Sequence, residues 1–217
     1  IDNITLYPRR QDGMLGVEVT WASSSIHIPD SYQVYRSDSE MGEYVMKSEE
    51  LDLSYFDSLD ESEMGNIFYY YILATFNENL TSVELAEKNS VAIGFSIPGS
   101  YDDIQMGIDS SIDGDSINVT EGSYTGVIDF GGKKIKLICQ GQPGDCILDG
   151  NGSGPVVSFT QAEDTATVLD GFTIKNGNSY QGGGGMVVYS DPLITNCIFE
   201  ENTTTINGGA IMIHTDA

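Results

Sequence analysis

The sequence predicts an all-β protein in two parts, an N-terminal β-sandwich followed by a solenoid of stacked strands. Three observations indicate this: strand-like segments fill the first hundred residues, the second half repeats every 25 residues, and a short amphipathic helix separates the two patterns. A chain of 217 residues can form two small domains. We expect the domains at 1–96 and 101–217, joined by a linker at 97–100 that contains Pro98 and Gly99.

The first part contains segments with the length and alternation of half-buried strands, namely NITLYP, GVEVTWAS, SYQVYRS, GEYVMKS, NIFYYYILATF and NSVAIGF. The inner face of the fifth is expected to carry Phe68, Tyr70, Ile72 and Ala74. YQVYRS, the hairpin that follows at 40–43, and FYYYILATF resemble strands of a fibronectin type III domain, although Phe68 stands where that family has a tyrosine. The resemblance implies a seven-stranded fibronectin type III-like β-sandwich.

A short helix is expected at the start of the second part. Ile104, Ile108 and Ile112 are spaced by four residues, so they would share one helix face. After Asp115 the apolar residues alternate with a period of two, beginning with Ile117, as in strands.

The repeat that follows predicts stacked coils. Apolar residues of VLDGFTIKNG recur 25 positions later in LITNCIFEEN, where Leu169, Phe172 and Ile174 correspond to Ile194, Cys197 and Phe199. Likewise, Gly184, Gly185 and Met186 correspond to Gly209, Ala210 and Ile211. Such a period is typical of solenoids, in which each coil buries its apolar face on its neighbour. Corner positions, where positive φ is tolerated, would be taken by Asn176, Asn178, Asn196 and Asn207.

Together, the cap helix and the repeat resemble right-handed parallel β-helix proteins, the pectin-lyase-like superfamily. The resemblance implies a right-handed parallel β-helix of about four coils with a short N-terminal cap helix. An antiparallel sandwich with coincidental spacing is the alternative. Lyases, glycosidases and adhesins share this architecture, so the resemblance does not fix a reaction. It does favour an extracellular or cell-surface protein, and a first residue of Ile1 rather than Met favours either a removed leader or a trimmed chain.

The charge restricts the partners. The sequence has 33 acidic and 9 basic residues, a net charge of −24, which repels nucleic acid phosphates and anionic membranes. No stretch is apolar enough for membrane insertion. We expect no cofactor, although the acidic surface would suit Ca²⁺. Five Asn-x-Ser/Thr sites are candidates for glycosylation: Asn3, Asn79, Asn118, Asn151 and Asn202.

Three cysteines give no disulfide framework by number alone. Cys139 and Cys146 flank the turn QGQPGD and either pair in an oxidising compartment or stay free. Cys197 takes an inward strand position, where it would be a small core hydrophobe.

The sequence offers no convincing catalytic residues. Lyases of the resembling family use an Arg or Lys base beside carboxylates that hold Ca²⁺, but no arginine follows Ile97. Its lysines after that point are Lys133, Lys134, Lys136 and Lys175, and Lys134 and Lys136 are expected to point outward. Glycosidases need two carboxylates on one face. Asp149 and Asp170, in similar LDG turns, could stack on adjacent coils, but a corner role that accepts backbone N–H groups is favoured.

The remaining polar candidates are ordinary by their spacing. His27 and His214 have no Cys, Asp or Ser neighbours in a recognised pattern. Asp109, Asp113 and Asp115 lack the spacing of a calcium loop and favour a turn after the helix.

The favoured function is therefore a secreted, non-enzymatic structural or adhesive surface protein. The sequence stops within a coil, which would leave Ile211 and Ile213 at an uncovered end, so we expect head-to-tail association of identical copies into a filament. Two alternatives remain open. One is an N-terminal fragment of a larger polysaccharide lyase or glycosidase. The other is a carbohydrate-binding module that uses Tyr124, Tyr180 and Tyr189 to stack on sugars.

Overall fold

The computed structural model describes residues 2–22, 29–75, 83–92, 94–142 and 144–214. The chain divides into two units, Ile1–Gly94 and Phe95–Ala217. The strand β8 (Phe95–Ile97) begins the second unit, although the sequence analysis divided these residues between the sandwich and the linker. The reason is its pairing: β8 runs parallel to β9 (Ser116–Val119), and both its apolar side chains are buried.

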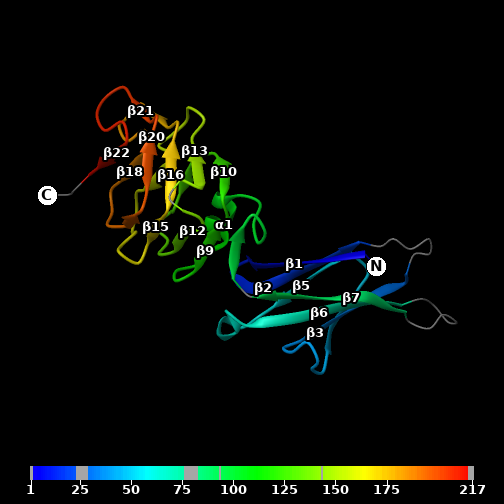
Figure 1. Cartoon of the computed structure of the whole chain (residues 1–217). Coiled ribbons are helices and arrows are strands. Elements are labelled where there is room, and N and C mark those ends of the chain that lie inside the picture. The colour runs from blue at the N-terminus through cyan, green and yellow to red at the C-terminus, as the bar shows by residue number, and fades with distance from the viewer. Residues whose placement is uncertain (1, 23–28, 76–82, 93, 143, 215–217) are drawn as a thin grey trace. The chain divides into compact units, whose positions relative to one another are not determined.

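The first unit consists of two antiparallel sheets (Figure 1). One has the order β1-β2-β5 and the other the order β4-β3-β6-β7. The strands are β1 (Asp2–Gln11), β2 (Met14–Ala22), β3 (Ser31–Ser37), β4 (Val45–Glu50), β5 (Ser54–Ser58), β6 (Ile67–Thr75) and β7 (Val83–Ala92), with a short 3₁₀ helix at Glu61–Glu63. The sequence analysis missed β5, because its five residues SYFDS lack a regular apolar alternation.

A buried polar network joins these two sheets. Asp57 on β5 is 1% exposed; its carboxylate accepts a hydrogen bond from the Tyr70 hydroxyl on β6 at 2.9 Å and pairs with Arg36 on β3 at 2.9 Å. Burial and the neighbouring carboxylate raise the pKa of Tyr70 far above its ordinary value, so the phenol stays a donor. The predicted inner face of β6 is confirmed, since Phe68, Tyr70, Ile72 and Ala74 are all buried.

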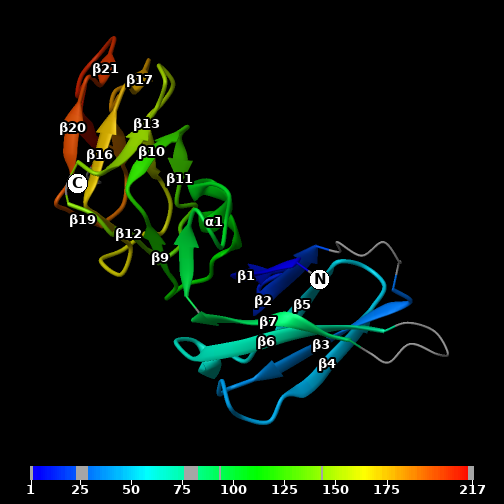
Figure 2. The same cartoon turned by 45° about the vertical axis from the view of Figure 1, so that its right-hand side comes forward.

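The second unit is a parallel β-helix in which β8 comes first and the cap helix α1 (Ile104–Ser110) follows, in contact with β8 and β11. Its sheets have the orders β8-β9-β12-β15-β19, β10-β13-β16-β20 and β11-β14-β18-β22, with a small pair β17-β21. Both views show β10, β13, β16 and β20 side by side, from green to red (Figures 1 and 2). The further strands are β10 (Gly122–Thr125), β11 (Ile128–Asp129), β12 (Lys136–Cys139), β13 (Cys146–Asp149), β14 (Val157–Phe159), β15 (Val168–Asp170), β16 (Phe172–Lys175), β17 (Asn178–Ser179), β18 (Met186–Val188), β19 (Leu193–Thr195), β20 (Ile198–Glu200), β21 (Thr203–Thr204) and β22 (Ile211–Ile213).

The solenoid has about five turns rather than the four that the sequence analysis predicted, because β8 precedes the cap helix and adds a fifth strand to the first sheet. The predicted 25-residue repeat is confirmed by parallel pairs such as Leu169 with Ile194 and Met186 with Ile211. The alternative of an antiparallel sandwich for this region is wrong. Of the predicted corner residues, Asn176 and Asn196 have positive φ, whereas Asn178 and Asn207 do not.

Burial in the core depends on having a neighbouring coil on both sides. Phe172 and Ile174 are 0% exposed. Phe199, which pairs with Ile174 from the last described coil, is only half-buried, and so are Ile194 and Cys197. The inward positions predicted from the repeat are therefore correct, but the last coil does not bury them fully.

The cap helix is fixed at both ends. The Asp103 carboxylate accepts a hydrogen bond from the Met106 N–H at 2.7 Å and caps the first turn. The Lys133 ammonium donates to backbone carbonyls at the other end, including that of Ile108 at 2.7 Å. Ile108 is buried as predicted, but Ile112 is 42% exposed, because the helix ends at Ser110.

Glu163 is a buried carboxylate that links three coils. It accepts hydrogen bonds from the Gly132 N–H at 2.8 Å, the Gln161 N–H at 2.9 Å and the Ser190 hydroxyl at 2.9 Å. Burial raises the pKa of Glu163, but the hydrogen bonds from these backbone and hydroxyl groups outweigh burial and hold the pKa below its ordinary value.

Replacing Phe172 by Ala should lower the free energy of unfolding by about 3–5 kcal/mol, because a fully buried ring would leave a cavity between coils. Chemical denaturation monitored by circular dichroism measures this. The matched control is Phe199→Ala, whose ring is only half-buried and whose removal should cost clearly less. Equal losses would contradict the stacking described above.

Replacing Glu163 by Gln should destabilise the protein by about 1–3 kcal/mol at neutral pH, because one acceptor atom replaces a charged group that holds three donors. Since the folded pKa lies below that of the unfolded chain, the carboxylate's contribution is complete above the unfolded value of ~4.3 and is lost as the pH falls through the folded value. The difference between wild type and variant should therefore shrink in acid. The exposed Glu200→Gln serves as control and should change little at any pH.

Candidate functional site

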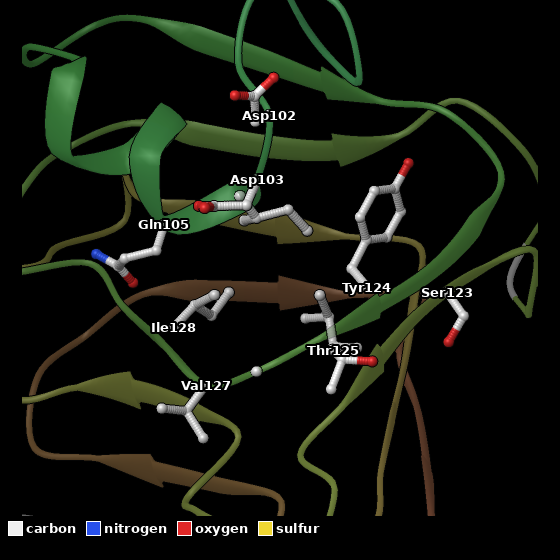
Figure 3. Close-up of a pocket in the computed structure, with 11 residues that line it drawn as sticks. Asp102, Asp103, Gln105, Ser123, Tyr124, Thr125, Val127 and Ile128 are labelled. Atoms are coloured by element: carbon white, nitrogen blue, oxygen red, sulfur yellow. The ribbon is translucent and has the colours of Figure 1, made fainter.

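A pocket of about 410 Å³ lies at the start of the β-helix (Figure 3). Four segments form it: the start of α1 with the two residues before it, the strand β10, the turn into β11, and Leu148 of β13. The lining residues are Asp102, Asp103, Ile104, Gln105, Ser123, Tyr124, Thr125, Gly126, Val127, Ile128 and Leu148.

The pocket has an aromatic wall and an apolar floor. Ile104, Ile128 and Leu148 are buried core residues whose surfaces reach the pocket. The Tyr124 hydroxyl is within hydrogen-bonding distance of two backbone carbonyls, that of Thr120 at 2.8 Å and that of Ile97 at 3.2 Å. These contacts fix the ring, which stands upright beside the segment that carries Asp102 and Asp103 (Figure 3).

Gly122 starts β10 with a φ of +154°, a backbone conformation that other residues rarely adopt. A Cβ atom there would lie 3.6–3.7 Å from the Tyr124 ring and hydroxyl, which is ordinary van der Waals contact. The glycine is therefore favoured by the backbone conformation rather than by the space that the ring needs.

The polar rim is acidic. Asp102 and Asp103 are exposed, and among the described residues no Arg, Lys or His lines the pocket. Gln105 is fully used in the structure, since its amide accepts from the Asp129 N–H at 2.8 Å and donates to the Asp129 carbonyl at 3.1 Å. This pair of bonds ties α1 to β11 and holds the two sides of the pocket at a set distance.

A second, more open hollow surrounds Asp149 and the corners of three coils. The Asp149 carboxylate accepts from the Asn151 N–H at 2.9 Å and from the Asn176 amide at 3.0 Å, and lies 3.8 Å from the Lys175 ammonium. The Asn151 N–H, followed by the Asn176 amide, lowers the pKa of Asp149. These contacts agree with the corner role that the sequence analysis favoured.

The candidate carboxylate pair is not formed by adjacent strands. Asp149 lies on β13, where its parallel neighbours are Thr125 and Lys175. Asp170 lies on β15 in another sheet, next to Ile138 and Thr195. The LDG turns at 148–150 and 169–171 therefore lie in different sheets, and the stacking of Asp149 on Asp170, the less favoured of the two possibilities, is not formed.

Three of the four lysines of the β-helix contact acceptors of the scaffold. Lys134 pairs with Asp164 at 2.7 Å, and the hydrogen bond to Asp164 raises the pKa of Lys134, which makes it a poorer base at neutral pH. Lys133 is held by the helix carbonyls, Lys175 lies beside Asp149, and Lys136 is exposed on β12.

The three predicted tyrosines lie apart in the fold. Tyr124 is on β10 and lines the pocket, while Tyr180 follows β17 and is 76% exposed. Tyr189 follows β18 and stacks on His214 of the next coil, with ring centroids 4.7 Å apart and planes 10° from parallel. A single row of tyrosines for one sugar chain is therefore not present among the described residues.

The candidate glycosylation sites differ in their environment. Asn151 is exposed in a turn with φ of 51°. Asn202 is engaged inside the coils, where its amide donates to the Ile174 carbonyl at 2.8 Å and accepts from the Gly177 N–H at 2.9 Å. Asn118 on β9 accepts from the Gln140 amide at 2.7 Å. Asn79 and the side chain of Asn3 lie outside the described residues.

The remaining candidates are structural. Asp115 accepts from the Ile112 N–H at 2.9 Å, as in a turn, whereas Asp113 accepts from the N–H of Lys134, 21 residues further along the chain, at 2.9 Å. Among the described residues, no group of three or more His, Cys, Asp or Glu side chains is arranged for a metal ion. No helix within the described ranges is long and apolar enough to span a bilayer. His27 lies outside these ranges.

Cys139 and Cys146 form a disulfide with Cα atoms 5.8 Å apart, so of the two open possibilities the structure has the pair. Cys197 is a free, half-buried thiol whose pKa is raised by burial.

No protein-family model and no curated protein matches the sequence. Two solved structures that resemble the chain are pectate lyases. Pectate lyase Pel3 of Pectobacterium carotovorum is 12% identical, with 100% of this chain and 87% of that chain covered and a TM-score of 0.33. Pectate lyase PelI of Erwinia chrysanthemi is 13% identical, with the same coverages and a TM-score of 0.33. The description of this chain as a parallel β-helix rests on its strand pairing.

Sequence reasoning missed the pocket. Asp103 could have been identified as a helix cap, because it precedes an apolar helical pattern. The approach of Tyr124 to Asp102 and Asp103 depends on the fold of the first coil, for which the sequence carries no local signal.

Proposed function

We propose that the chain is an extracellular, non-enzymatic structural or adhesive surface module. The observation that carries the proposal is the use of three of the four lysines of the β-helix: Lys133, Lys134 and Lys175 each contact acceptors of the scaffold, while Lys136 is exposed on β12. A lyase base must instead be available to take a proton from the substrate. The disulfide between Cys139 and Cys146 favours an oxidising compartment. The strand orders β1-β2-β5 and β4-β3-β6-β7 favour a fibronectin type III-like first unit.

The second candidate is part of a larger polysaccharide lyase or glycosidase. The parallel β-helix favours it as a fold, but fold alone carries little information on activity. A carbohydrate-binding module is the third, and the pocket beside Tyr124 is the feature that favours it.

The purified chain should release no unsaturated products from polygalacturonate or alginate, with or without Ca²⁺. Ultraviolet absorbance of the products measures this. Product formation that disappears in Lys136→Ala or Lys175→Ala would contradict the proposal and support the lyase reading. Lys88→Ala, in the first unit, is the control for a general effect of charge.

We further propose that copies associate head to tail through the last described coil. Ile211 there is half-buried and Ile213 is 65% exposed, whereas Met186 and Val188, their neighbours one coil earlier, are buried. The cap of the same β-helix exposes apolar side chains too, since Met106 is 39% exposed. A cap placed on the last coil would bury both surfaces.

Association should strengthen with salt, because a net charge of −24 repels identical copies at low ionic strength. Sedimentation velocity across a salt series measures this. Ile213→Glu should abolish association, while Met41→Glu, at a 91% exposed position in the first unit, should not. A monomer at high concentration and high salt would refute the proposal.

A further inference from the structure

We infer that the pocket of Figure 3 binds a saccharide that carries a free amino group. This ligand would serve the adhesive role of the proposed function, and its biological role rests on that proposal. The binding itself rests on the residues of the pocket alone.

The size and the lining fit one sugar ring with part of its neighbour. A volume of about 410 Å³ lies within the range of ~300–1,000 Å³ typical of small-molecule sites. A pyranose has an apolar C–H face and a polar edge. The Tyr124 ring with the floor of Ile128 and Leu148 offers an apolar surface, and the acidic rim offers acceptors beside it.

The charge of the lining selects the class of sugar. Asp102 and Asp103 are the carboxylates that line the pocket, and no basic side chain does so in the described part of the chain. Uronic acids would be repelled, because their carboxylates would face these two without a cation between them. An ammonium group would gain a charge-assisted hydrogen bond to Asp102 and could also lie over the aromatic ring.

One oxygen of Asp103 is already used, because Oδ1 accepts from the Met106 N–H. A carboxylate has a second oxygen with free lone pairs. Asp103 can therefore accept a further hydrogen bond from a sugar hydroxyl while it still caps α1. We assign Asp102 to the amino group and Asp103 to a neighbouring hydroxyl.

The pocket is preformed. The backbone contacts of the Tyr124 hydroxyl hold the aromatic wall, and the Gln105–Asp129 bonds hold α1 against β11. A ligand would therefore not have to order these walls on binding. The other predicted tyrosines are less suited, because His214 stacks on Tyr189 and Tyr180 lines none of the pockets described above.

Isothermal titration of the whole chain with glucosamine oligomers tests the inference. N-acetylglucosamine oligomers of equal length should bind at least ~10-fold more weakly, because acetylation removes the charge. Oligogalacturonate should not bind. Asp102→Asn should weaken glucosamine binding by about tenfold and abolish the preference over the acetylated oligomer.

Variants of the tyrosines complete the design. Tyr124→Ala should remove binding, while Tyr124→Phe, which keeps the ring, should retain most of it and guards against loss of fold in the first variant. Tyr180→Ala is the matched control and should bind normally.

Three results would overturn the inference: oligogalacturonate binding at least as well as glucosamine oligomers, no difference between the free and acetylated amines, or oligolysine binding equally well and surviving Tyr124→Ala. Such binding of oligolysine would mean that the acidic surface attracts any cation and that the pocket does not recognise a sugar. If the glucosamine oligomers do not bind, the inference is wrong, but the result of the lyase assay is unchanged. If the chain cleaves uronates, the proposed function is wrong, but the binding of amino sugars is not tested by that result.

Discussion

The β-helix depends on one constraint, that each coil buries its inward apolar side chains only by stacking on the coils before and after it. Parallel strands place equivalent residues directly above one another, as with Ile174 and Phe199. Every inward position must then hold a side chain that fits its counterparts in the adjacent coils, which lie 20 to 32 residues away in the described strand pairs. Because burial comes from neighbours, Phe172 is fully enclosed, whereas the last described coil leaves the equivalent position half open.

The same constraint explains the polar corners. A coil can turn only where the backbone groups find partners, so the side chains at the turns bond to the next coil rather than to solvent. Glu163 satisfies donors on two other coils, and Asn202 satisfies a carbonyl and an N–H of the preceding coil. Gly184 shows how closely the coils approach, because a Cβ there would clash with the Thr203 carbonyl. The polar side chains Glu163 and Asn202 thus serve the stacking of the coils.

The sequence predicts those features of the fold that leave a pattern in neighbouring or regularly spaced residues, and not those that depend on contacts between distant segments. The repeat made Leu169 and Met186 recognisable as core residues, because a periodic pattern survives in a single sequence. The first strand of the β-helix, Phe95–Ile97, was divided between the sandwich and the linker, because it precedes the helix and belongs to no repeat. Asp149 and Asp170 looked equivalent because their local motifs are the same, but a coil has several faces and the motif does not say which one. The pocket could not be predicted, because its walls come from segments that are separate in the sequence and lie together only in the folded β-helix.

The two kinds of acidic residue in this chain have different physical roles. Carboxylates such as Asp57 and Glu163 are enclosed by donors, so their charge is compensated inside the fold. Asp102 is exposed at the rim of the pocket beside Tyr124, which apolar side chains line in part. None of the described residues that line this pocket is basic. A carboxylate that is enclosed by hydrogen-bond donors stabilises the fold. A carboxylate that is exposed beside an apolar surface favours positively charged ligands over negatively charged ones. The chain's strong acidity therefore matters for recognition chiefly where it borders such a surface, and the hollow beside Tyr124 is such a place.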